Sequence, residues 1–215
     1  MAKKSNKRNS KIVGINDEFA SCSVFLKEFK IGLRPILKYV RDGSLHPRMM
    51  GLFSKIKSLD RNSASGSFHV REGLKTIKGK MLLREFVFTP KAGIRQQFGN
   101  PQIDEEDFSV VWEDFDPSPT RFPKGATHFD FMYLVLAYDP DRNLFTTYAA
   151  VPIRRSKKDG QERLEMRPEK TIVRREGMQF ILVAGIRFME ILGDEEYASG
   201  GQDGVGMEIL GVVWD

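Results

Sequence analysis

The chain has 215 residues, of which 40 % are hydrophobic and 29 % are charged. This composition is ordinary for a globular protein and excludes the low hydrophobicity and high net charge that keep chains disordered. Cys22 is the single cysteine, so no intrachain disulfide can form. The longest apolar run, residues 131–138, is far shorter than the ~20 residues of a membrane-spanning helix, and Asp17 and Glu18 interrupt the region where a signal peptide needs an apolar stretch. We expect a folded cytoplasmic protein with no transmembrane segment.

The net charge of +5 hides an uneven distribution along the chain. Residues 1–89 contain 19 Lys and Arg against 7 Asp and Glu, whereas residues 90–215 contain 15 against 22, which gives +12 and −7. Opposite fields of this kind steer surfaces toward each other but do not determine a fold. Two kinds of partner follow from the division: an external polyanion, or the acidic half of a second copy.

Residues 1–15 are predicted to form a basic arm. The arm carries five positive charges and no acidic residue, at Lys3, Lys4, Lys7, Arg8 and Lys11. Among its first eleven residues only Met1 and Ala2 are apolar, so burial of apolar area cannot offset the entropy lost on ordering them. We therefore predict that residues 2–11 are dispensable for folding but needed for partner binding.

Residues 16–80 are predicted to form a helical module, with Asn16 or Asp17 as the first N-cap. The predicted helices cover residues 16–29, 34–41 and 47–60. The third helix has an apolar face formed by Met49, Leu52, Phe53, Ile56 and Leu59, and an opposite basic face formed by Arg48, Lys55 and Lys57. Residues 61–68 are mostly small and polar and are predicted to form a loop, while the pattern assigns no element to residues 69–80.

Residues 81–215 are predicted to form an antiparallel β-sandwich of about seven or eight strands, so that the chain is an α+β, mainly β protein. Strand-like runs cover residues 83–88, 108–115, 128–138, 143–153, 179–191 and 206–215, with shorter candidates at 94–98 and 163–167. No amphipathic helix separates these runs, which favours antiparallel over parallel pairing. Two hairpins are expected, with turns at residues 139–143 and at Asp159 and Gly160.

Asp139, Asp141 and Asn143 place oxygen donors at alternate positions, as at the start of a calcium-binding loop. Such a loop needs glycine at its sixth position and glutamate at its twelfth, where this chain has Leu144 and Ala150. The segment is therefore interpreted as a turn between two strands.

His128 and Asp130 alternate on one predicted strand, and such a pair can serve a metal ion or an acid–base step. The other histidines, His46 and His69, lie in the helical module, so the sequence indicates no third ligand. A polar outer strand face is the favoured interpretation. Cys22 lies on an apolar helical stripe and is interpreted as a packing residue rather than a nucleophile.

Three further motifs receive structural interpretations. The glycine-rich residues 199–206 contain no lysine and precede a strand, so they are interpreted as a connection and not as a phosphate-binding loop. Residues 104–107 and 113–116 are interpreted as solvated turn acids. Two basic clusters interrupt the acidic half and would form one cationic patch only if the sheet brought them to the same end: Arg154, Arg155, Lys157 and Lys158, and Arg174 and Arg175.

No pattern specifies a catalytic, cofactor or metal site, so we predict a non-enzymatic structural or interaction protein without a cofactor. Its basic N-terminal half would dock an acidic protein partner or a second copy in a homo-oligomer. The alternative is a nucleic-acid-binding protein that contacts phosphates without sequence preference. The predicted binding residues are Lys3, Lys4, Lys7, Arg8, Lys11, Arg48, Lys55, Lys57, Arg154, Arg155, Lys157 and Lys158.

Overall fold

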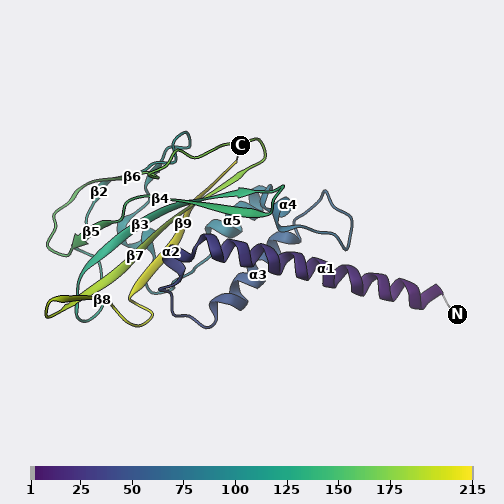
Figure 1. Ribbon diagram of the computed structural model, residues 1–215, viewed down its shortest axis with the longest axis horizontal. Helices are drawn as coiled ribbons and strands as arrows, with labels where there is room; N and C mark the ends of the chain where they lie inside the picture. Colours follow the sequence, from purple (N-terminus) through teal and green to yellow (C-terminus); the bar gives the residue numbers. More distant parts are fainter. Residues whose placement is uncertain (1–2, 215) are drawn as a thin grey trace. The chain divides into compact units, whose positions relative to one another are not determined.

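The computed structural model describes residues 3–214, and for residues 3–13 and Ile15 it describes the backbone alone. The described chain forms two compact units (Figure 1). The helical unit comprises residues 3–31 and 43–85, and the β unit comprises residues 32–42 and 86–214. Each unit therefore contains two separate stretches of the chain.

The helical unit is built around one long helix. Its helices are α1 (Lys3–Gly32), α3 (Leu45–Lys57), α4 (Val70–Leu74) and α5 (Ile77–Arg84), with the last residue of α1 already in the β unit. The prediction of a helix N-cap at Asn16 or Asp17 is wrong, because α1 begins at Lys3. Lys and Arg, which favour helices, are frequent in residues 3–16. The poor helix formers in these residues are Gly14 and the polar Ser and Asn residues. No helix in the described part of the chain is both long and apolar enough to cross a membrane.

The side chains of the predicted basic arm lie outside what the structure describes, as do Met1 and Ala2 altogether. The affected cations are Lys3, Lys4, Lys7, Arg8 and Lys11. Their role in partner binding therefore stays a prediction.

One face of α1 and one face of α3 form the core of the helical unit. Phe53 of α3 is fully buried, and its ring centroid lies 5.1 Å from that of Phe25 and 5.2 Å from that of Phe29. Edge-to-face aromatic pairs of this kind add about 0.5–1.5 kcal/mol to the effect of burial. The predicted burial of the apolar face of α3 is confirmed. Cys22 is also buried, which raises the pKa of its thiol and agrees with a packing role.

Asp60 organises the loop that follows α3. Its buried carboxylate accepts hydrogen bonds from the backbone N–H groups of Asn62 (2.9 Å), Ser63 (3.0 Å) and His69 (2.9 Å). Burial alone would raise the pKa of Asp60, but hydrogen bonds to the charged form outweigh it and hold the pKa below its ordinary value. The loop predicted at residues 61–68 is confirmed.

The β unit contains two short helices and nine strands in its described part. The helices are α2 (Arg34–Leu37) and α6 (Ile94–Phe98), and the strands are β1 (Gln102–Ile103), β2 (Val110–Phe115), β3 (Ala126–Asp139), β4 (Leu144–Ala149), β5 (Ile153–Ser156), β6 (Glu162–Met166), β7 (Gln179–Leu192), β8 (Glu195–Ala198) and β9 (Val205–Trp214). All strand pairs are antiparallel. The short sheet has the order β1-β2-β6, and the long sheet has the order β4-β3-β7-β8, with β5 on β3 and β9 on β7. The predicted α+β class with antiparallel strands is confirmed.

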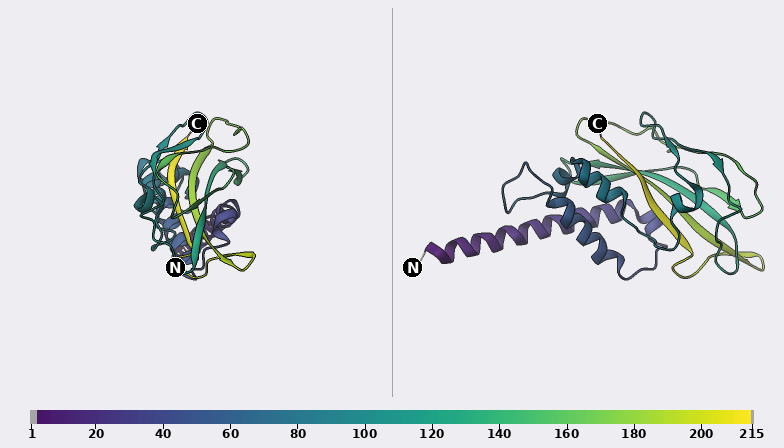
Figure 2. Two further views of the ribbon diagram at one scale, coloured as in Figure 1. Left: turned by 90° about the vertical axis from the view of Figure 1, so that its left-hand side faces the viewer. Right: turned by 180° about the vertical axis from the view of Figure 1, so that it is seen from behind.

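The long sheet is curled around a core that it shares with the short sheet (Figure 2). β3 and β7 are 14 residues each, and the right-handed twist of strands accumulates over such lengths. The ring of Phe131 on β3 lies 5.2 Å from Trp112 and 5.5 Å from Phe115, both on β2. The predicted sandwich itself is not confirmed, because the two sheets are unequal and one of them is curled.

Two predicted strands, residues 83–88 and 94–98, are wrong. Residues 77–84 form α5, whose N-cap Thr76 accepts a hydrogen bond from the Gly79 N–H through its side-chain hydroxyl at 2.9 Å. Residues 94–98 form α6. Glu208 on β9 accepts hydrogen bonds there from the backbone N–H of Arg95 (2.9 Å) and from its guanidinium group (2.5 Å). This partner lies more than 100 residues later in the chain, so the local pattern does not reveal it.

The hairpin predicted around residues 139–143 is confirmed, whereas the hairpin around Asp159 is wrong. Asp139 accepts two backbone N–H groups of the turn between β3 and β4, in agreement with the turn interpretation. At Asp159 a turn is present, because its carboxylate accepts the Ser156 N–H at 2.7 Å. However, β5 pairs with β3 and β6 pairs with β2, so this turn passes from one sheet to the other. Residues 199–204 connect β8 to β9, so the interpretation of the glycine-rich stretch as a connection before a strand is confirmed, although Val205 and Gly206 already belong to β9.

Phe53→Ala should lower the free energy of unfolding by about 3–5 kcal/mol, because it removes a fully buried ring from the core of the helical unit. Urea denaturation of the full chain measures the loss. Phe19→Ala is the control, since Phe19 is 60 % exposed on α1 and its truncation should change stability by no more than about 0.5 kcal/mol. A loss below about 1 kcal/mol for Phe53→Ala would contradict the packing described here.

Candidate binding groove

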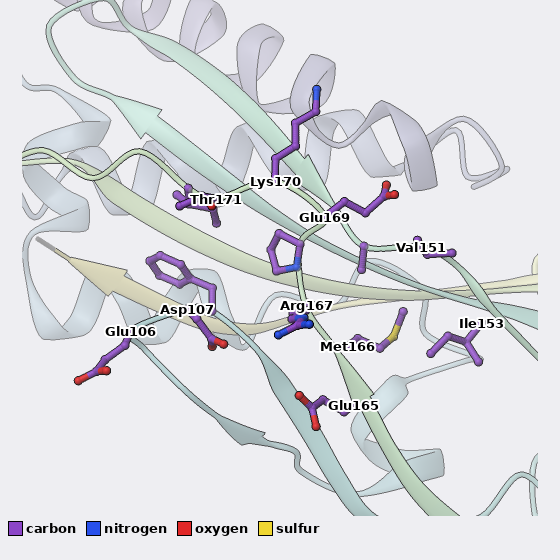
Figure 3. A pocket seen from close by; sticks show the side chains of 14 residues that line it. Glu106, Asp107, Val151, Ile153, Glu165, Met166, Arg167, Glu169, Lys170 and Thr171 are labelled. Carbon is purple, nitrogen blue, oxygen red and sulfur yellow. The ribbon is translucent and has the colours of Figure 1, made fainter.

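The β unit contains a groove of about 730 Å³ beside the outer edge of β6 (Figure 3). β6 is the edge strand of the short sheet, because it pairs with β2 alone. The groove is lined by residues 106–108, 150, 151, 153 and 165–172. Its volume lies in the range of ~300–1,000 Å³ that is typical of ligand pockets. It is large enough to accept a few side chains of a partner.

The floor of the groove is apolar. Phe108, Ala150 and Met166 contribute buried side chains, and Ile153 is partly buried beside them. Val151, in contrast, is 60 % exposed although it lines the same groove. An apolar side chain placed here would bury further area against this floor.

Phe108 holds one wall in place. Its φ of 60° is uncommon for a residue other than glycine, and the Tyr133 hydroxyl donates a hydrogen bond to its carbonyl oxygen at 2.7 Å. Arg174 lies over the Phe108 ring at 5.0 Å and donates a hydrogen bond to the Glu105 carbonyl at 2.7 Å. Burial, and to a lesser degree the charge of Asp107, raises the pKa of Tyr133 well above its ordinary value, so its hydroxyl remains a donor.

Two contacts between residues 149–155 and residues 162–169, which lie on facing walls, mark the ends of the groove. Near one end the Glu169 N–H donates a hydrogen bond to the Ala149 carbonyl at 3.0 Å. Beyond the other end Arg155 of β5 forms an ion pair with Glu162 of β6. The open stretch between these contacts spans residues 150–154, which is about 13 Å at the rise of an extended strand.

The backbone of the groove offers little for a β ladder. Pro152 and Pro168 lie in the two facing walls and have no N–H group to donate. Val151 makes no hydrogen bond with the described part of the chain. A partner in this groove could pair with the Val151 backbone, but the prolines interrupt a longer ladder, so most of its contacts would be with side chains.

The rim of the groove carries a surplus of negative charge. Its acids are Glu106, Asp107, Glu165 and Glu169, and its bases are Arg167 and Lys170, so four negative charges face two positive ones. Glu106 and Glu169 come from opposite walls (Figure 3). Glu165 is paired with Arg163 at 2.6 Å, whereas neither Glu106 nor Glu169 has a cationic partner among the side chains that the structure describes. A cationic partner would find these two carboxylates free.

His128 and Asp130 are buried, at 6 % and 7 % exposure, so the interpretation of a polar outer strand face is wrong. Asp130 accepts hydrogen bonds from Arg187 of β7 at 2.6 Å and from Arg154 of β5 at 3.1 Å. Arg154 also binds Glu196 of β8 through two hydrogen bonds, of 2.7 and 2.9 Å. Burial alone would raise the pKa of Asp130, but the two guanidinium groups outweigh it and lower the pKa below its ordinary value.

This charged network joins strands rather than forming a metal centre. His128 has its Nδ1 atom 2.9 Å from the Thr127 hydroxyl and its Nε2 atom 3.9 Å from Glu196. Arg187 also donates a hydrogen bond to Tyr39, which follows α2, and lies over its ring at 4.6 Å. Among the residues that the structure describes, no group of three or more His, Cys, Asp and Glu side chains could hold a metal ion.

The two basic clusters of the acidic half lie at opposite ends of β3. Arg154 binds Asp130 near the start of this strand, while Arg175 binds Asp139 at its end at 2.6 Å. Nine residues separate the two aspartates, which is about 30 Å along a strand. The clusters therefore do not form one patch.

The remaining predicted binding residues differ in how far they are neutralised. Arg154 and Arg155 have acidic partners, whereas Lys157 and Lys158 are exposed and have none within the described chain. On α3, Lys57 is paired with Glu18 at 2.8 Å, Lys55 is exposed, and Arg48 donates a hydrogen bond to Ser44 at 3.3 Å. Partner binding by these residues stays a prediction.

Sequence reasoning did not identify the groove. Residues 104–107 were interpreted as turn acids, and nothing in residues 165–172 marks a binding surface. The groove combines three segments, of which residues 106–108 lie about 40 to 60 residues before the other two, and their meeting depends on β5 and β6 belonging to different sheets. The prolines and the surplus of acids were visible signals, but neither specifies a groove on its own.

No protein-family model, no curated protein and no solved structure matches this chain.

Asp130→Asn should lower the free energy of unfolding by about 3 kcal/mol at neutral pH, because it leaves Arg187 without its buried counter-charge. The carboxylate has a lowered pKa, so its contribution is present above the unfolded pKa of ~3.9 and is lost as the pH falls through the folded value. The difference between wild type and variant should therefore shrink below about pH 4. Urea denaturation at several pH values measures it, with Glu113→Gln, a half-exposed acid, as the control that changes little.

Proposed function

We propose that the protein is a non-enzymatic interaction protein that self-assembles, with the cationic N-terminal half of one copy docking on the acidic β unit of another. The observation that carries this proposal is the groove beside β6. It combines an apolar floor with the rim carboxylates of Glu106 and Glu169, which have no cationic partner in the described chain. These are the features of a surface that receives a cationic protein segment.

The division of charge between the two units supports the same proposal. Residues 1–31 and 43–85 contain 16 Lys and Arg against 6 Asp and Glu, which is +10. Residues 32–42 and 86–215 contain 18 against 23, which is −5. Complementary charge of this size raises association rates and is screened by salt over about 8 Å at physiological ionic strength.

Three of the six acidic residues of the helical unit bind partners within that unit. Glu18 accepts the backbone N–H of Gly66 at 2.9 Å in addition to its ion pair with Lys57. Asp60 is engaged by backbone N–H groups, and Glu72 is paired with Lys75 at 2.9 Å. Three exposed lysines, by contrast, have no acidic partner in the described chain: Lys27, Lys55 and Lys78. The positive charge of this unit thus remains available to a partner.

Replacing the five arm cations by glutamine should reduce self-assembly. Light scattering of the nuclease-treated full chain should show a mass that rises with protein concentration at low salt and falls as salt is added. The variant with Lys3, Lys4, Lys7, Arg8 and Lys11 changed to Gln should have a lower mass at equal concentration. Changing Arg121 and Lys124 to Gln is the matched control and should leave the scattering mass unchanged, because these two exposed cations lie in the β unit and are not among the predicted binding residues.

Nucleic acid is the competing partner, and the same proteins distinguish it. If the wild type stays monomeric at every salt concentration and binds duplex DNA, self-assembly is overturned. The arm variant should then weaken DNA binding and reduce the salt slope by up to about 0.9 for each lost phosphate contact.

A further inference from the structure

We infer that the groove beside β6 is the acceptor for the N-terminal segment of a second copy. The inference rests on the proposed self-assembly and names the binding site for it. One copy would place residues from its first thirteen, which contain the arm cations, against the acidic rim and the apolar floor of another copy.

The N-terminal segment and the rim of the groove carry opposite charge. The N-terminal segment carries five cations before its first acid at Asp17, while the rim of the groove carries four acids against two bases. A single exposed ion pair contributes only about 0.2–1 kcal/mol, so no one pair would suffice. Glu106 and Glu169 lie on facing walls. Several cations that bind near them at the same time would together give an appreciable attraction.

The N-terminal segment also contains apolar side chains that match the floor of the groove. Ile12 and Val13 directly follow Lys11, so one short segment can place an aliphatic side chain and a cation in the groove at the same time. Burial of one such side chain contributes about 1.5–3 kcal/mol, more than any single rim pair. The apolar floor and Val151 therefore supply most of the affinity, and the charges orient the segment.

The length of the groove also matches a short helical segment. The open stretch of the groove is about 13 Å long, which is the length of about nine helical residues. The backbone of α1 is helical from Lys3 onward. A stretch such as residues 4–12 thus has the length that the groove accepts, and it includes Lys4, Lys7, Arg8 and Lys11 as well as Ile12.

A peptide titration tests the inference. A fluorescein-labelled peptide of residues 2–16 is titrated at low salt with the full chain whose own five arm cations are changed to Gln, and anisotropy is measured. Binding should saturate, and the added Glu106→Gln and Glu169→Gln pair should weaken it about fivefold, as expected for two lost surface ion pairs. The matched control, Glu113→Gln with Asp114→Asn, removes two exposed acids outside the groove and should leave the affinity unchanged.

Two further variants test the apolar contact in the groove and the effect of the rim charge on peptide affinity. Val151→Ser should weaken peptide binding about threefold or more, whereas Val173→Ser should have no effect, since Val173 is equally exposed (62 %) but lies outside the groove. Lys170→Glu should tighten binding, because it removes a rim cation and adds an acid. All of these side chains are exposed, so the variants should remain folded, which circular dichroism verifies.

The outcomes separate the inference from the proposed function. Equal peptide affinity for the groove variants and their controls overturns the groove as acceptor. If light scattering still shows assembly that needs the arm cations, the proposed function survives with an acceptor elsewhere. If the wild type neither assembles nor binds the peptide, both fail.

Discussion

The antiparallel pairing of β3 with β7 is the constraint on which the β unit depends. The register runs from Ala126 opposite Glu190 to Tyr138 opposite Gln179, and every other strand of the long sheet pairs with one of these two. The row formed by Arg154, Asp130 and Arg187 specifies this register electrostatically, because a shift by one residue would move Asp130 to the opposite face. The pairing therefore determines where each edge strand begins.

The groove is a consequence of that arrangement. β5 remains on the edge of β3, while the next strand, β6, crosses to β2 and leaves its outer edge without a neighbour. β3 also supplies Tyr133, which holds the Phe108 wall through its hydroxyl. This contact ties the Phe108 wall to the long sheet, which lowers the entropy cost of ordering that wall when a partner binds.

Electrostatics then distinguishes the two kinds of charged residue in this protein. Buried or half-buried acids such as Asp60 and Asp130 are satisfied inside their own units and have lowered pKa values, so they stabilise the fold above acidic pH. Glu106 and Glu169 at the groove have no cationic partner among the described side chains. Together with exposed lysines of the helical unit such as Lys27, Lys55 and Lys78, they form a second group whose charge is available to a partner.

The sequence by itself determined the features that depend on local pattern. These are the apolar runs that became β3, β7 and β9, the aromatic core of α1 and α3, the turn at Asp139 and the division of charge. Tertiary structure decided the rest: the helix at residues 94–98, the separation of β5 from β6, the burial of Asp130 and the groove itself. The physical reason is that each of these depends on partners 24 to more than 100 residues away, such as Arg154 for Asp130 and Glu208 for Arg95, and periodicity carries no information about such pairs.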